Sequence, residues 1–144
     1  MSITKSQDFY GWTQEQAALL RAGRWSETDL AQLAEEIENM GRSEWRELES
    51  RLKVLLVHLL KWRFQPSHRG RSRELTIKEQ RRAVFHVLKA NPSLEPRLDE
   101  VLADAYELAI LGAARETGLD EGAFPERCPW SIEAVLNPEF LPGN

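Results

Sequence analysis

The 144-residue chain has one cysteine, Cys128. A single thiol excludes an intramolecular disulfide and a zinc site built from several cysteines, and it suits a reducing compartment. Long apolar runs are also lacking: the longest, residues 54–60, contains His58, and the first ten residues have no apolar signal region. Because a membrane-spanning helix needs about 20 apolar residues, these features predict a cytoplasmic protein that does not enter a membrane.

Sequence motifs of the common enzyme classes are missing as well. The chain has no phosphate-binding glycine loop, no dinucleotide-binding GxGxxG, no GxSxG and no HExxH. Its three histidines are scattered, and none follows a glutamate at the Glu-x-x-His spacing of di-iron bundles. We therefore expect no cofactor and no metal, and we favour a protein that is not an enzyme.

Helix signals dominate what is present, and they predict an all-α fold. Thr13 with Gln16 resembles a capping box, and Gly23 is placed to end that helix. Thr76 with Glu79 resembles a second capping box. The predicted helices cover residues 13–22, 27–63, 76–90 and 93–116, with a short helix near 131–136 inside a proline-rich strap at the C-terminal end. Residues 67–74 are predicted to form a basic, flexible loop.

The predicted helix over residues 27–63 organises this fold. Its apolar positions recur at helical spacing on both sides of Gly41: Leu30, Leu33, Ile37 and Met40 before it, and Trp45, Leu48, Leu52, Leu55, Leu59 and Trp62 after it. The two series share one phase, which favours an uninterrupted helix, although a break with Ser43 as a new N-cap is the alternative. We expect an elongated helical bundle, one domain over residues 1–144, and pairing with a second copy as a dimer.

Charge is concentrated in blocks along the chain. Residues 26–60 carry eight acids and four bases, residues 61–82 carry eight bases and two acids, and the chain from Glu95 carries eleven acids and three bases. The basic segment 61–82 can bind an anion or nucleic acid, or it can pair with the acidic flanks. The candidate anion-binding residues are Arg63, Arg69, Arg71, Arg73, Arg81 and Arg82.

Two polar residues lie close to the apolar stripe of the long helix. Glu44 is adjacent to Met40 and Leu48 on the helix surface, and it is interpreted either as a partner for an arginine of another helix or as a buried acid. His58 lies at the margin of the stripe, as expected of a satisfied boundary histidine. A metal-dependent enzyme that uses His58 and glutamates from a partner helix is a further alternative. The other glutamates of this helix are expected to face solvent in i,i+4 pairs with arginine or lysine.

Nearly the whole chain resembles a known family. The segments DFYGWTQEQAALLRAGRW, EEIENMGRSEWRELESRL, LTIKEQRR and FPERCPWSIEAVLNPEFLP occur in this order between Asp8 and Pro142. They resemble a bacterial family known as domain of unknown function number twenty-nine. The resemblance implies a small helical intracellular protein, and it implies no activity, cofactor or catalytic residue.

These observations favour a non-enzymatic helical module that contacts other proteins through its long helix and its five tryptophans. Binding of nucleic acid or a phosphate-bearing ligand through residues 61–82 is the first alternative. The metal-dependent enzyme is the second.

Overall fold

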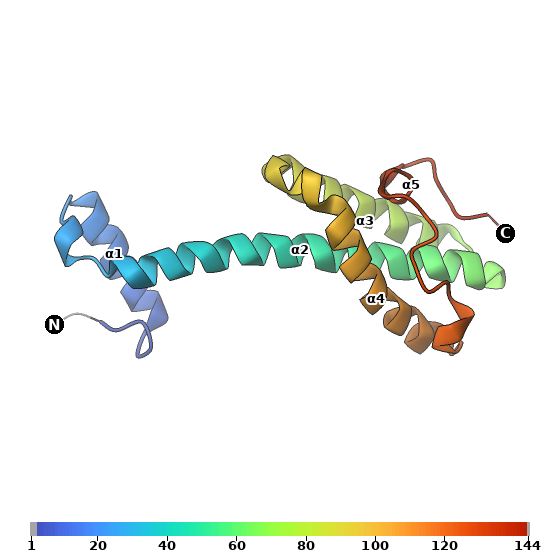
Figure 1. The fold of residues 1–144 in the computed structure, drawn as a ribbon, viewed down its shortest axis with the longest axis horizontal. Helices are drawn as coiled ribbons and strands as arrows, with labels where there is room; N and C mark the ends of the chain where they lie inside the picture. Colours follow the sequence, from blue (N-terminus) through green and yellow to red (C-terminus); the bar gives the residue numbers. More distant parts are fainter. Residues whose placement is uncertain (1–2, 144) are drawn as a thin grey trace. The chain divides into compact units, whose positions relative to one another are not determined.

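The computed structural model describes residues 3–143, and its regular elements are all helical (Figure 1). The α-helices are α1 (Phe9–Arg21), α2 (Leu30–Phe64), α3 (Arg71–Ala90), α4 (Leu98–Thr117) and α5 (Ile132–Leu136). Short 3-10 turns occupy Trp25–Glu27, Pro66–His68, Pro92–Arg97 and Glu121–Ala123. The prediction of an all-α bundle around one long helix is confirmed.

Contacts divide the chain into two compact units, one up to Gly41 and one from Arg42 onward. The expectations of a single domain over residues 1–144 and of an elongated outline stay predictions. The helix α2 runs through Gly41 without a break, so the alternative of a new helix capped by Ser43 is wrong. It begins at Leu30, three residues later than predicted, because Trp25–Glu27 form a 3-10 turn and Thr28 is extended.

In the first unit, α1 begins at Phe9 and not near Thr13. Asp8 provides the cap, since its carboxylate accepts a hydrogen bond from the Gly11 N–H at 2.9 Å. The Thr13 hydroxyl donates instead to the Tyr10 carbonyl at 2.7 Å. Gly23 adopts a left-handed φ of 73° just beyond the helix, as predicted for a residue that ends it.

The second unit holds the main hydrophobic core. Its buried side chains come from the second half of α2, from α3, from α4 and from the segment around α5. The helix α3 runs back along α2, and α4 crosses α2 (Figure 1). The helix α4 lies close to α2 at Gly112, where an added methyl group would lie 3.0 Å from Val57 Cγ2. A glycine at this position therefore lets the two helices pack closely.

The connections around α3 differ in part from the prediction. The expected loop over residues 67–74 is too long, because α3 begins at Arg71 after an extended Gly70. Thr76 is inside the helix, where its hydroxyl donates to the Ser72 carbonyl at 3.0 Å, so it is not a cap. The predicted helix from Ser93 begins at Leu98, because Pro92 and Pro96 lie in a 3-10 turn.

The predicted ends of the last two helices are confirmed. Gly118 closes α4 with a φ of 76°. Ser131 caps α5 by accepting a hydrogen bond from the Ala134 N–H at 3.2 Å.

Candidate functional site

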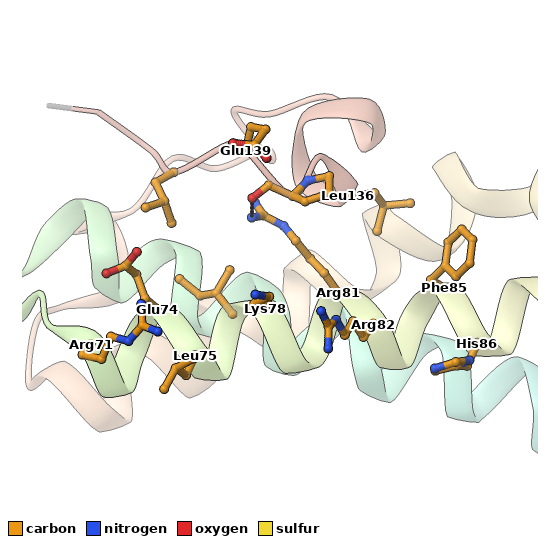
Figure 2. Close-up of a pocket in the computed structure, with 13 residues that line it drawn as sticks. Arg71, Glu74, Leu75, Lys78, Arg81, Arg82, Phe85, His86, Leu136 and Glu139 are labelled. Atoms are coloured by element: carbon orange, nitrogen blue, oxygen red, sulfur yellow. Dashed lines mark hydrogen bonds between the residues drawn. The ribbon is translucent and has the colours of Figure 1, made fainter.

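The second unit contains a cleft of about 750 Å³ between α3 and residues 136–142, which we call the C-terminal strap (Figure 2). One wall is a face of α3, on which residues 71, 74, 75, 78, 81, 82 and 85 recur every three or four positions. Fourteen residues separate the ends of this face, about 21 Å along the helix. The strap contributes Leu136, Pro138, Glu139 and Leu141 to the opposite wall. The cleft thus follows α3, which lines it with cationic and apolar side chains.

Arg81 holds the two walls together. Its Nε donates to the Val135 carbonyl at 2.9 Å and its Nη2 to the Phe140 carbonyl at 2.6 Å, with a longer contact of 3.5 Å from Nη1 to the Pro138 carbonyl. The residue is only 7% exposed, and this burial lowers the pKa of its guanidinium. Arg81 therefore positions the strap, and its donors are already in use.

Three other cations of the cleft are available to a ligand. Within residues 3–143, the side chains of Arg71, Lys78 and Arg82 are exposed and make no hydrogen bond or ion pair. Two carboxylates, Glu74 and Glu139, also line the cleft, so its charge is mixed with an excess of bases.

Exposed apolar side chains alternate with these cations. Leu75 and Phe85 lie on the same face of α3, and Phe85 is 66% exposed. A large apolar side chain that is open to solvent beside unpaired cations is suited to contact a ligand that is both apolar and anionic.

The remaining arginines of the predicted anion-binding set lie outside the cleft. Arg63 donates to the Gly143 carbonyl at 2.5 Å and Arg69 to the Trp62 carbonyl at 2.7 Å, while Arg73 Nη1 lies 3.5 Å from the Lys61 carbonyl. Arg69 also lies over the Trp62 ring, 5.5 Å from its centroid. The structure thus brings Arg71, Arg81 and Arg82 together and uses Arg63, Arg69 and Arg73 elsewhere.

Several of these arginines donate hydrogen bonds to backbone carbonyl oxygens. The sequence had offered ion pairs with the carboxylates of the acidic flanks as their alternative role. Lys61 does form an ion pair with an acidic flank, to Glu116 at 3.0 Å. The sequence predicts a strap at the C-terminal end but does not place it against α3, and sequence reasoning missed Leu75, Lys78 and Phe85. The signal that could have found them is the i, i+3, i+4, i+7 spacing from Arg71 onward, but the predicted loop over residues 67–74 places Arg71 and Arg73 outside a helix.

Glu44 and His58, the two polar candidates on α2, do not meet. Glu44 is exposed and accepts a hydrogen bond from Asn91 Nδ2 at 3.0 Å. His58 is half-buried, and among the described residues its buried Nδ1 has no hydrogen-bond partner. Burial is the main cause that lowers the pKa of His58, and the charge of Lys61 adds to it.

The described part of the chain was expected to hold no metal, and two structural observations concern metal binding and membrane insertion. No group of three or more histidine, cysteine or acidic side chains is placed there to hold a metal ion. No helix in residues 3–143 combines the length and the apolar character that crossing a bilayer requires.

Of three comparisons with known proteins, one gives a match, and the match is to a protein family. Comparison with curated proteins and comparison with solved structures give no significant match. A family model described as "Domain of unknown function DUF29" matches residues 5–141, nearly the whole chain. The protein therefore belongs to the DUF29 family.

Proposed function

We propose that this protein is a non-enzymatic interaction module whose cleft along α3 binds an acidic, amphipathic segment of another protein. The observation that carries the proposal is the alternation of three unpaired cations with exposed apolar side chains on one face of α3. A partner segment of matching chemistry would place carboxylates against the cations and apolar side chains against Leu75 and Phe85.

The spacing of the cations favours a helical partner. Arg71 and Lys78 are seven residues apart, about 10 Å along α3, and Arg82 follows Lys78 by one turn. A helix that lies along α3 would present acids at the same intervals on one face. The guanidinium forks of Arg71 and Arg82 suit bidentate bonds to carboxylates.

A protein segment suits this cleft better than a nucleic acid. Glu74 and Glu139 line the cleft and would repel a phosphate backbone, whereas a peptide can place a basic or neutral residue beside them. Among the described residues that line the cleft, Phe85 contributes one phenyl ring, whereas successive bases would stack on a row of rings. We therefore favour a protein segment as the ligand, and the experiment below uses RNA to test the nucleic-acid alternative.

The test is fluorescence anisotropy with a labelled synthetic helix that carries leucine and phenylalanine on one face and glutamates on its flanks. We expect binding that weakens as salt is added, because charge pairing contributes to it. Lys78→Glu combined with Arg82→Glu should weaken binding by about tenfold or more. The matched control is Lys89→Glu, an exposed α3 residue outside the cleft, which should leave binding unchanged.

Two results would count against the proposal. One is equal binding of the peptide to the double variant and to the control. The other is tighter binding of a labelled single-stranded RNA than of the acidic peptide, which would favour the nucleic-acid alternative.

We also propose a cytoplasmic location. Cys128 is a free, half-buried thiol whose pKa is raised mainly by burial, and a hydrogen bond with the backbone of Trp130 partly opposes this effect. A reduced thiol of this kind is usual in a reducing compartment.

A further inference from the structure

The first unit has a very small core of its own. Between Ile3 and Gly41 the fully buried side chains are those of Trp12 and Gln16, and Gln16 Oε1 accepts a hydrogen bond from the Asp29 N–H at 2.8 Å. Chain segments of about 40 residues rarely bury enough apolar surface to be stable without a further element. The unit therefore has little buried apolar surface of its own to stabilise it.

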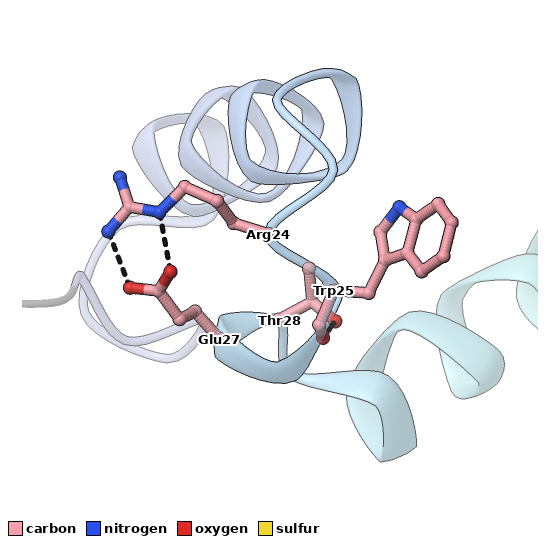
Figure 3. Close-up of polar contacts among 4 residues, drawn as sticks. All are labelled: Arg24, Trp25, Glu27 and Thr28. Carbon is pink, nitrogen blue, oxygen red and sulfur yellow. Dashed lines mark hydrogen bonds and ion pairs between the residues drawn. The ribbon is translucent and has the colours of Figure 1, made fainter.

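Large apolar side chains are nevertheless abundant in this unit, and many face solvent. Leu30 is 64% exposed and Ile37 is 67% exposed, both on the first part of α2. Trp25, in the turn before α2, points away from the ion pair of Arg24 with Glu27 (Figure 3) and is 65% exposed. The Arg24–Glu27 pair and the bond from the Thr28 hydroxyl to the Trp25 carbonyl at 2.6 Å fix this turn. The exposed side chains thus lie on ordered elements.

One face of α2 has the pattern of a self-complementary surface. Leu30, Ala34, Ile37 and Gly41 are spaced by four, three and four residues, which places them on one side of the helix. All four are exposed, and a methyl group added at Gly41 would have no neighbour within 4 Å. Along the helix these four residues alternate between large and small. A second copy of the helix that runs antiparallel to the first would therefore place each large residue opposite a small one.

From this register we infer that a second copy of the chain packs antiparallel on this face, with Leu30 opposite Gly41 and Ile37 opposite Ala34. The two-fold axis then lies between residues 35 and 36, and each contact occurs twice. Ala34 and Gly41 allow the two backbones to approach, and the large side chains fill the space beside them. With α1 from each copy, the arrangement contains four helices.

Charge predicts how this association responds to salt. Residues 3–41 contain three bases and seven acids, a net charge of −4 per copy. Apolar contact between two units of the same sign should strengthen when salt screens their repulsion. Peptide binding in the α3 cleft should weaken under the same conditions, so the two surfaces are distinguished by salt alone.

The test is sedimentation equilibrium of the full chain over a wide concentration range. We expect a reversible dimer for the natural sequence. Gly41→Leu should weaken it by about tenfold or more, because the new side chain occupies the position of Leu30 from the other copy. In the single chain this leucine meets open space and is a better helix former than glycine, so loss of folding would not explain the effect.

A second variant tests the register. Leu30→Ala combined with Gly41→Leu exchanges the large and small partners, and it should restore dimerisation. Phe85→Ser, which removes an exposed apolar side chain of the other unit, should leave the dimer unchanged. A single-chain mass at all concentrations, a dimer that tolerates Gly41→Leu, or a double variant that stays monomeric would each overturn the inference.

Discussion

Arg81 Nη2 donates to the Phe140 carbonyl at 2.6 Å, although 59 residues separate the two along the chain. The bond connects the middle of α3 to the C-terminal strap. We therefore expect the position of the strap, and with it the shape of the cleft, to depend on the Arg81 guanidinium.

Replacing Arg81 should destabilise the fold. Arg81→Met removes a charged donor from the Val135 and Phe140 carbonyls in a buried site, and we expect a loss of about 3 kcal/mol in unfolding free energy. Arg82→Met is the matched control, and as an exposed neighbour it should change stability by about 0.5 kcal/mol or less. Chemical denaturation measures both. Equal midpoints for the two variants would show that the strap is held by its apolar contacts.

The two glycines inside α2 and α4 should respond oppositely to the same substitution. Gly112→Val places atoms against Val57, and overpacking of this kind costs about 1–3 kcal/mol. Gly41→Val meets open space and replaces a poor helix former, so it should be neutral or stabilising. Thermal unfolding at low protein concentration compares them. A stable Gly112→Val variant would mean that α2 and α4 can separate without cost.

His58 should make stability depend on pH in the mildly acidic range. Burial lowers its pKa in the folded chain below the ordinary value of about 6.5, so the unfolded chain binds the proton more readily. The contribution of neutral His58 to the free energy of unfolding is therefore fully present above about pH 6.5, and it decreases as the pH falls below about 6.5. We expect the melting temperature of the natural sequence to fall more than that of His58→Gln between about pH 7 and pH 5. If the melting temperatures of the two proteins fell in parallel, the imidazole would be equally solvated in the folded and unfolded chains.

Tyr106 should produce a corresponding effect at high pH. Its hydroxyl donates to the Pro125 carbonyl at 2.6 Å, and burial raises the pKa of Tyr106 to about 12. The unfolded phenol ionises near pH 10, so folding stability decreases as the pH rises from about 10 towards 12. Tyr106→Phe should remove this decrease.

The same variant should also lower stability at neutral pH by about 1 kcal/mol, because the Pro125 carbonyl loses its donor. Absorbance titration in a Tyr10→Phe background isolates the ionisation of Tyr106. An ionisation near pH 10 in the folded protein would contradict the buried position.

Much of the fold could be predicted because its signals are local. The phase of the apolar stripe crosses Gly41 unchanged, and α2 is continuous there. Gly23 takes the left-handed conformation that ends a helix, as its position predicted. Helix starts were less predictable because several residues compete to cap one end: Asp8 caps α1 in place of Thr13, and α3 begins four residues before the first apolar residue of its helix face, Leu75.

The candidate site was predicted only in part. Clustered arginines are visible in a sequence, and Arg71 and Arg82 do line a cleft. Backbone carbonyl acceptors carry no residue-specific signal, so the roles of Arg63, Arg69 and Arg81 could not be read from side-chain types. The strap that forms the second wall is distant in sequence from α3, and only tertiary contact reveals it.

The acceptors around Arg81 have an electrostatic consequence for encounters with a partner. Carbonyl dipoles orient the guanidinium without cancelling its positive charge, and burial is the cause that perturbs its pKa. Its field therefore extends into the cleft and adds to that of Arg71, Lys78 and Arg82. An acidic molecule diffusing nearby would be attracted before any contact forms, so a residue that touches no ligand can still raise the association rate.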